Sequence, residues 1–113
     1  MKDTMVLFTR FGMGDAPAEL QQKLAGIFLN LINQDTPPPV IAFYGEGVKL
    51  VCDGSPVLDP LRALSEKGTR LIICQTCLDT FNLRDHIKIG IVGGMGDIVA
   101  AMNAATSSPP QKF

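Results

Sequence analysis

Short apolar segments alternate with helical segments along the whole chain, and this alternation constrains the fold more than any other feature. Four apolar runs of strand length lie at residues 5–9, 40–44, 69–74 and 87–92. The segments between them carry apolar residues at helical spacing, and Gly or Pro marks most of the junctions. Strands that alternate with helices pair in parallel through right-handed crossovers. We therefore predict an α/β fold: a doubly wound, mostly parallel sheet of about five strands with helices on both faces.

The longest predicted helix follows the first strand. Asp15 is its predicted N-cap, and the prolines at 37–39 end it because proline cannot continue the hydrogen-bond ladder. Six apolar residues repeat at helical spacing and are predicted to form one buried face: Leu20, Leu24, Ile27, Phe28, Leu31 and Ile32.

Three more helices are predicted further along the chain. One begins at Ser55 and Pro56 and ends at Gly68, a residue type suited to a C-cap. A short helix covers 76–83. The last helix, over 98–105, is apolar on nearly every side, which is typical of a helix buried on more than one face. It therefore indicates a subunit interface.

Residues 1–106 are predicted to form a single domain, since 113 residues fit one compact unit. Residues 107–113 contain two prolines and are predicted to be a flexible C-terminal tail. Residues 48–51, after the second strand, are predicted to be a short extended return.

Charge and composition argue against several classes of protein. A formal net charge of -1, with no cluster of Lys and Arg, argues against nucleic-acid binding. The apolar runs are far shorter than the roughly 20 residues of a membrane span, and the N-terminal segment lacks the apolar core of a signal peptide. Three cysteines without an export signal indicate reduced thiols, so we predict a cytoplasmic protein.

The sequence Cys74-Gln75-Thr76-Cys77 lies where the third strand turns into the short helix. Binding sites in such sheets collect at the carboxyl ends of the strands. Free amides and the dipole at a helix start stabilise a thiolate, the reactive form for disulfide exchange or for carrying a sulfane sulfur. We interpret Cys74 and Cys77 as the candidate catalytic pair. The alternative is that both are small buried apolar side chains.

Cys52 has no close cysteine partner in the sequence, and we interpret it as structural. A zinc site formed by Cys52, Cys74, Cys77 and His86 is an alternative, because four nitrogen and sulfur ligands suffice for zinc. Only one CxxC pair and one histidine are present, which disfavours it. No metal and no cofactor is predicted.

The tetrapeptide Gly-Met-Gly-Asp occurs twice, at 12–15 and 94–97, each time between a predicted strand and a predicted helix. One reading is an anion-binding loop at a helix N-terminus. Neither copy completes a nucleotide-binding pattern. We therefore interpret the glycines as turn residues and the aspartates as helix caps.

Several motifs occur in an order and spacing that resemble a known family. They are Gly47-Val48-Lys49-Leu50, Gly54-Ser55-Pro56-Val57-Leu58, Gly68, and Cys74-x-Thr76-Cys77-Leu78-Asp79 followed by Leu83. From about residue 5 to residue 105, the chain resembles the DsrE/DsrF-like family, and most nearly the C-terminal domain of the YedF-type proteins linked to sulfur and selenium metabolism. The resemblance implies a DsrE-like doubly wound fold, a homo-oligomer (often a trimer or hexamer), and a sulfurtransferase-like role in sulfur relay.

The resemblance also implies roles for the two cysteines. Cys74 corresponds to the strand-end cysteine that carries a persulfide in the sulfur-transferring members, and Cys77 to a second cysteine of the YedF-like subgroup. YedF-type proteins usually carry a TusA-like domain that this sequence lacks, so the implied partner is a TusA-like sulfur-carrier protein or another sulfur donor or acceptor. Gly94-Met95-Gly96 departs from the Asn-Met-Tyr-like turn of the family.

Two other functions stay open at the level of sequence. One is a dithiol redox module, since the CxxC spacing suits thiol–disulfide exchange. The other is a non-enzymatic oligomeric binding subunit in which the cysteines are incidental.

Overall fold

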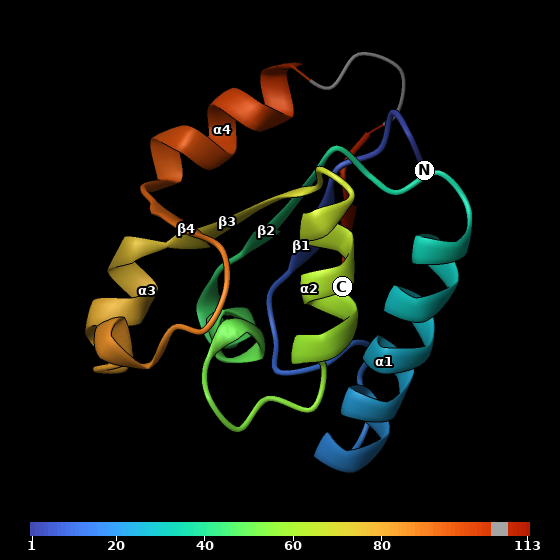
Figure 1. Cartoon of the computed structure of the whole chain (residues 1–113). Helices are drawn as coiled ribbons and strands as arrows, with labels where there is room; N and C mark the ends of the chain where they lie inside the picture. The colour runs from blue at the N-terminus through green and yellow to red at the C-terminus, as the bar shows by residue number, and fades with distance from the viewer. Residues whose placement is uncertain (105–108) are drawn as a thin grey trace.

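The computed structural model describes residues 1–104 and 109–113, whose five strands form a single sheet (Figure 1). In chain order the elements are β1 (Val6–Phe8), α1 (Ala18–Gln34), β2 (Val40–Phe43), the 3-10 helix η1 (Gly45–Val51), α2 (Leu58–Glu66), β3 (Arg70–Cys74), α3 (Gln75–Thr80), the 3-10 helix η2 (Arg84–His86), β4 (Ile91–Gly93), α4 (Met95–Ala104) and β5 (Gln111–Lys112). All the strands pair in parallel, in the order β4-β3-β2-β1-β5. The predicted α/β fold with a parallel sheet is confirmed.

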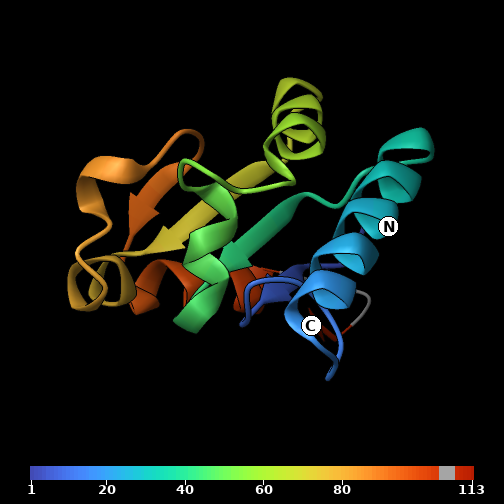
Figure 2. The same ribbon diagram turned by 90° about the horizontal axis from the view of Figure 1, so that it is seen from below.

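The strand order explains how the helices are shared between the two faces of the sheet. The connections from β1 to β2, β3 and β4 all advance in one direction, so right-handed crossovers place their helices on one face. The connection from β4 to β5 runs back past β1, so α4 lies on the other face. Figure 2 shows this division, with α1 and α2 on one side of the strands and α4 on the other.

The core between the sheet and α1 is built from large side chains on alternate strand positions. The Phe8 ring stacks on Phe43 of the neighbouring strand, with their centroids 5.8 Å apart, and meets Phe28 of α1 edge-on at 6.3 Å. Phe8, Phe43 and Ile73 are in register across three strands and are fully buried. Such runs of buried apolar residues are typical of a parallel sheet covered on both faces.

The face that α1 buries overlaps the predicted one only in part, because Phe28 and Ile32 pack as predicted. The residues on its packed side are Ala25, Leu29 and Ile32, whereas four of the predicted core residues are exposed: Leu20, Leu24, Ile27 and Leu31. The helix also begins after Pro17 and not at Asp15. Periodicity detects a helix, but this helix carries two overlapping apolar stripes, and periodicity does not decide which one packs.

Residues 45–51 form the 3-10 helix η1 and not the predicted extended return. The backbone of Gly47 lies so close to β1 that a Cβ atom there would be 2.0 Å from the Phe8 carbonyl oxygen. Val48, Leu50 and Val51 are all buried. The segment is therefore a tightly packed part of the core, placed beside the carboxyl ends of β1 and β2.

The segment predicted as a flexible tail contains β5. Residues 107 and 108 lie outside the described residues, but the strand at 111–112 pairs in parallel with β1. Beyond it, the Phe113 ring lies 6.1 Å from Phe8 and 4.9 Å from Phe28 between ring centroids. A two-residue polar strand held mainly by backbone hydrogen bonds leaves no apolar pattern in the sequence, so the strand was not predictable.

Two element boundaries also differ from the predicted ones. Helix α2 begins at Leu58, later than the predicted start at Pro56, but Gly68 follows its end with φ +103° as predicted for a C-cap. Strand β4 covers only the last part of the predicted 87–92, because Ile87 forms an isolated antiparallel bridge with Cys52. Among the described residues, no helix is long and apolar enough to cross a membrane.

Candidate functional site

Cys74 and Cys77 lie at the carboxyl end of β3, where the chain turns into α3 (Figure 1). Both are free thiols, and their predicted positions at the strand end and in the first helical turn are confirmed. Their environments differ, because the Cys74 residue is only 2% exposed whereas Cys77 is partly exposed. In the described structure, Cys77 is therefore the thiol that an incoming molecule reaches more easily.

A backbone amide from a neighbouring element reaches the sulfur of Cys77. The Gly45 N–H donates a hydrogen bond to the Cys77 Sγ atom, with 3.1 Å between nitrogen and sulfur. Gly45 follows β2, which lies beside β3, so the parallel strands bring the two segments together. Its φ of +58° favours glycine, and a Cβ atom there would lie 3.1 Å from the Thr9 carbonyl oxygen. A glycine-dependent turn thus aims this amide.

Burial raises the pKa of the Cys77 thiol, and the nearby Cys74 thiol raises it further, while the hydrogen bond from Gly45 acts in the opposite direction. The amides at the start of α3 give no side-chain cap hydrogen bond to Cys74. The stabilisation of a Cys74 thiolate by the start of this helix stays a prediction. The amide that contacts a thiol, that of Gly45, was missed because it lies 32 residues before Cys77 in the sequence.

A lysine and an aromatic ring flank the same region. The Lys49 ammonium lies 5.0 Å from the centroid of the Phe81 ring and 2.7 Å from a carboxylate oxygen of Glu46. Phe81 is one turn beyond Cys77, whose carbonyl accepts the Phe81 N–H. Glu46 directly follows Gly45. The cation–π contact thus joins η1 to the end of α3, and the ion pair with Glu46 holds the Lys49 side chain within η1.

The other polar groups near the CxxC motif pair with one another. Arg84 donates two hydrogen bonds to Asp79, at 3.0 and 2.9 Å, and this holds the pKa of Asp79 below its usual range. The His86 Nδ1 atom lies 3.2 Å from a carboxylate oxygen of Asp53. The carboxylate therefore engages the histidine that was considered as a zinc ligand.

Cys52 is buried at the far end of η1. Its Sγ atom donates a hydrogen bond to the Val48 carbonyl at 3.3 Å, and both burial and the Asp53 carboxylate raise the pKa of its thiol. Within residues 1–104 and 109–113, no group of three or more His, Cys, Asp or Glu side chains is placed to hold a metal ion. Cys52, Cys74, Cys77 and His86 are therefore not arranged as a group of zinc ligands in the described part of the chain.

The two Gly-Met-Gly-Asp segments differ in structure. Asp97 accepts a hydrogen bond from the Gly94 N–H at 2.8 Å, so it satisfies an amide at the start of α4, as predicted. Asp15 does not cap α1, and its carboxylate instead lies 3.9 Å from the Arg10 guanidinium. The capping interpretation is confirmed for the second copy and wrong for the first.

The sheet order, the covered faces and the cysteines at the strand end define an α/β protein with a candidate thiol site. The chain belongs to the DsrE/DsrF-like family, whose model matches residues 11–107. No curated protein matches the sequence. The narrower likeness to YedF-type proteins stays a prediction.

Three solved structures share this fold at low sequence identity. The E. coli ychN protein superposes with a TM-score of 0.68 at 12% identity, covering 100% of both chains. Protein BT1422 of unknown function from Bacteroides thetaiotaomicron gives 0.67 at 15% identity, covering 98% of this chain and 95% of the other. Protein MTH1491 of unknown function from Methanobacterium thermoautotrophicum gives 0.63 at 17%, covering 97% and 99%. These likenesses support the fold alone.

Proposed function

We propose that this protein is a sulfur-relay carrier in which Cys74 and Cys77 handle a sulfane sulfur. The DsrE/DsrF-like family, to which the chain belongs, is associated with sulfur relay. The observation that carries the proposal is the pairing of two free thiols at the carboxyl end of β3, one of which accepts the Gly45 amide. In parallel sheets this edge is where ligands and reacting groups collect.

The proposed transfer step needs no external oxidant or reductant. A cysteine thiolate attacks the outer sulfur of a donor persulfide, R–S–SH, and the donor leaves as the thiolate R–S⁻. The attacking cysteine becomes Cys–S–SH, and the sulfane sulfur has moved without a net redox change. The same exchange can pass the sulfur between the two cysteines, because the thiolate of one attacks the outer sulfur of the other.

The burial of the two thiols suggests the direction of this relay. The partly exposed Cys77 would receive the sulfur from the donor, and the buried Cys74 would then hold it as the persulfide. A persulfide in a buried position is shielded from water and from other thiols. The hydrogen bond from Gly45 becomes stronger when Cys77 is ionised, because bonds to a charged acceptor are roughly twice as strong as neutral ones.

The experiment is persulfide loading followed by mass spectrometry. The protein is incubated with a low-molecular-weight persulfide, the thiols are blocked with iodoacetamide, and added sulfur atoms are located on peptides. We expect one added sulfur on wild type, a slower gain in Cys77→Ser and no stable load in Cys74→Ser. Cys52→Ser is the matched control and should load like wild type. Unchanged loading of the Cys74→Ser/Cys77→Ser double variant would refute the proposal.

The second candidate is a dithiol redox module, and the CxxC spacing of two free thiols at the junction of β3 and α3 favours it. Here Cys77 attacks the inner sulfur of a Cys74 persulfide, HS⁻ leaves, and a Cys74–Cys77 disulfide forms. A dithiol reductant must then restore both thiols. Release of sulfide together with formation of a reversible Cys74–Cys77 disulfide in the loading experiment would identify the dithiol redox function.

A further inference from the structure

The face of the sheet covered by α4 carries a small hollow between β3, β4 and α4. Its volume is about 130 Å³. Its lining residues are Arg70, Ile72, Ile91, Val92, Gly93 and Asp97. Of the residues of α4 only Ile98 is buried, although the helix was predicted to be buried on more than one face. The helix therefore leaves part of this face of the sheet uncovered.

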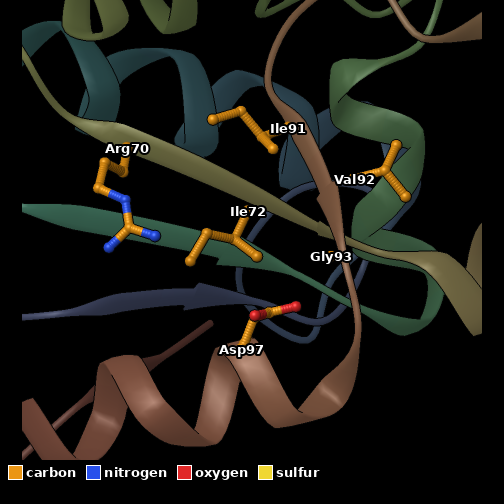
Figure 3. Close-up of a pocket in the computed structure, with 6 residues that line it drawn as sticks. All are labelled: Arg70, Ile72, Ile91, Val92, Gly93 and Asp97. Carbon is orange, nitrogen blue, oxygen red and sulfur yellow. The ribbon is translucent and has the colours of Figure 1, made fainter.

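Two groups of opposite charge face each other across this hollow. Figure 3 shows Arg70 extending from β3 on one side, Asp97 extending from α4 on the other, and Ile72 between them. Among the described residues, the Arg70 side chain makes no hydrogen bond or ion pair, and the Asp97 carboxylate bonds only to the Gly94 amide through one oxygen. The guanidinium and the other carboxylate oxygen remain available to a ligand that carries both charges.

Cys74 lies on the same face of β3 as this hollow. Ile73 is in register with the phenylalanines of β1 and β2 that pack against α1. Because successive side chains of a strand point to opposite faces, Arg70, Ile72 and Cys74 all point towards α4. Gly93, which lines the hollow, is the register partner of Cys74. The hollow therefore lies beside the candidate sulfur carrier on one strand and one face.

Gly93 keeps the hollow open next to Cys74. A Cβ atom at Gly93 would lie 2.9 Å from a carboxylate oxygen of Asp97 and 3.3 Å from a methyl carbon of Ile72. A side chain at this position would therefore fill the hollow. Pockets for drug-sized ligands have volumes of roughly 300–1,000 Å³. A hollow of about 130 Å³ suits a smaller molecule, of the size of a single amino acid.

We propose that this hollow binds a small amino-acid thiol that accepts the sulfane sulfur from Cys74, an inference that rests on the proposed function. The carboxylate of the acceptor pairs with Arg70, whose planar fork matches carboxylate geometry. Its ammonium pairs with Asp97, and its short apolar stem lies over Ile72. Its thiol points along β3 towards Cys74. Free cysteine has this combination of groups.

The transfer step is an exchange without net oxidation. The acceptor thiolate R–S⁻ attacks the outer sulfur of the persulfide Cys74–S–SH. A new S–S bond forms and the old one breaks, so that R–S–SH leaves with the sulfane sulfur and Cys74 remains as the thiolate. Positions on the same face of a strand are about 7 Å apart, and the S–S bond of the persulfide spans about 2 Å of that separation. A thiol held over Ile72 is therefore within reach of the outer sulfur.

Another pair of opposite charges lines a hollow on α1, where Glu19 and Lys23 lie beside Leu20. Helix α1 covers the other face of the sheet from α4 (Figure 2). The sheet therefore separates a molecule bound on α1 from the side of β3 that carries Cys74. The position of the hollow between Arg70 and Asp97 on the Cys74 side of the sheet, more than its charges alone, selects it as the acceptor site.

The test follows the discharge of loaded protein to three small thiols. Protein that carries a persulfide at Cys74 is mixed with L-cysteine, with 3-mercaptopropionate, which lacks the ammonium, or with cysteamine, which lacks the carboxylate. Arg70→Gln should slow transfer to L-cysteine and 3-mercaptopropionate about fivefold, the upper end for an ion pair in contact with water, and should leave cysteamine unchanged. Asp97→Asn retains an oxygen for the Gly94 amide, and it should slow transfer to L-cysteine and cysteamine but not to 3-mercaptopropionate.

Each thiol is compared between wild type and variant, so differences in intrinsic reactivity cancel. Arg62→Gln removes an exposed arginine of α2 and is the matched control, for which all three rates should stay unchanged. Unchanged rates in Arg70→Gln and Asp97→Asn, or equal slowing for all three thiols, would overturn the inference and leave the proposed function standing. Failure of Cys74 to load would refute the proposed function, and the acceptor step with it.

A binding measurement separates the hollow from the sulfur chemistry. L-Serine carries the same charges as L-cysteine but no thiol, so it should bind without reacting. Titration with L-serine, followed by NMR, should shift the amide signals of Gly93 and Gly94 to saturation. Arg70→Gln should weaken this binding about fivefold. The absence of saturable shifts at these two residues would overturn the inference whether or not Cys74 loads.

Discussion

The two ends of η1 hold two thiols in opposite hydrogen-bonding roles. At its first residue, the Gly45 amide donates to the sulfur of Cys77, and next to its last residue, the sulfur of Cys52 donates to the Val48 carbonyl. Burial raises the pKa of both thiols. The direction of the pKa shift alone therefore does not separate a candidate reactive cysteine from a structural one. The direction of the hydrogen bond does.

The difference matters because ionisation changes the two contacts in opposite ways. If Cys52 loses its proton, a negative sulfur faces the Val48 carbonyl oxygen, and the Asp53 carboxylate adds to the repulsion. If Cys77 loses its proton, its contact with Gly45 becomes a charge-assisted hydrogen bond. The same short helix therefore opposes ionisation at one end and assists it at the other.

The largest effect is expected from Gly47→Ala. This substitution displaces η1 and with it the hydrogen bonds that η1 makes to Cys77 and Cys52. The new Cβ atom would lie 2.0 Å from the Phe8 carbonyl oxygen, so the helix must move. We expect the free energy of unfolding to fall by more than about 3 kcal/mol in urea titrations. Gly54→Ala is the control, because its Cβ meets nothing within 4 Å and only the φ of +82° costs energy, about 1 kcal/mol. Equal losses in both variants would contradict this account.

Alkylation rates compare the reactivity of Cys77 and Cys52 directly. With limiting iodoacetamide at pH 8, we expect Cys77 to react about 100-fold faster than Cys52, because Cys52 is exposed only when the structure opens locally. Peptide mass spectrometry measures both sites in the same sample. Similar rates at the two sites would show that the burial of Cys52 does not limit its reactivity.

Substitution of Cys74 tests how much this residue contributes to the raised pKa of Cys77. The Cys74 thiol raises the pKa of Cys77, so Cys74→Ala should shift the pH profile of Cys77 alkylation to lower pH. Cys74→Ser retains a hydroxyl at this position and should shift the profile less. An unchanged profile in Cys74→Ala would mean that burial alone sets the pKa.

The smallest effect is the pH dependence of stability. Both thiols have a folded-state pKa above the unfolded value of about 8.5, so the fold favours the neutral form. That contribution is complete below the unfolded pKa and is lost as the pH rises through the folded pKa values. Urea titrations from pH 7 to pH 10 should therefore show a steeper loss for wild type than for Cys52→Ala/Cys77→Ala. Parallel curves would contradict the raised pKa values.

The parts of this molecule that the sequence predicted depend on local patterns. The alternation of strands and helices, the C-cap at Gly68 and the position of Cys74 at a strand end all follow from neighbouring residues. The contact between Gly45 and Cys77 depends on which strands are neighbours in the sheet, and local pattern does not contain that information. The packed face of α1 and the pairing of β5 depend on tertiary contacts in the same way.

The position of β1 between β2 and β5 has a consequence for the nascent chain. One edge of β1 can pair as soon as β2 has been made, but the other edge waits until residues 111 and 112 leave the ribosome. An unpaired edge of buried apolar residues is a template for pairing with other chains. While the residues between β1 and β5 are being synthesised, β1 therefore keeps one unpaired edge of the kind that can pair with other chains.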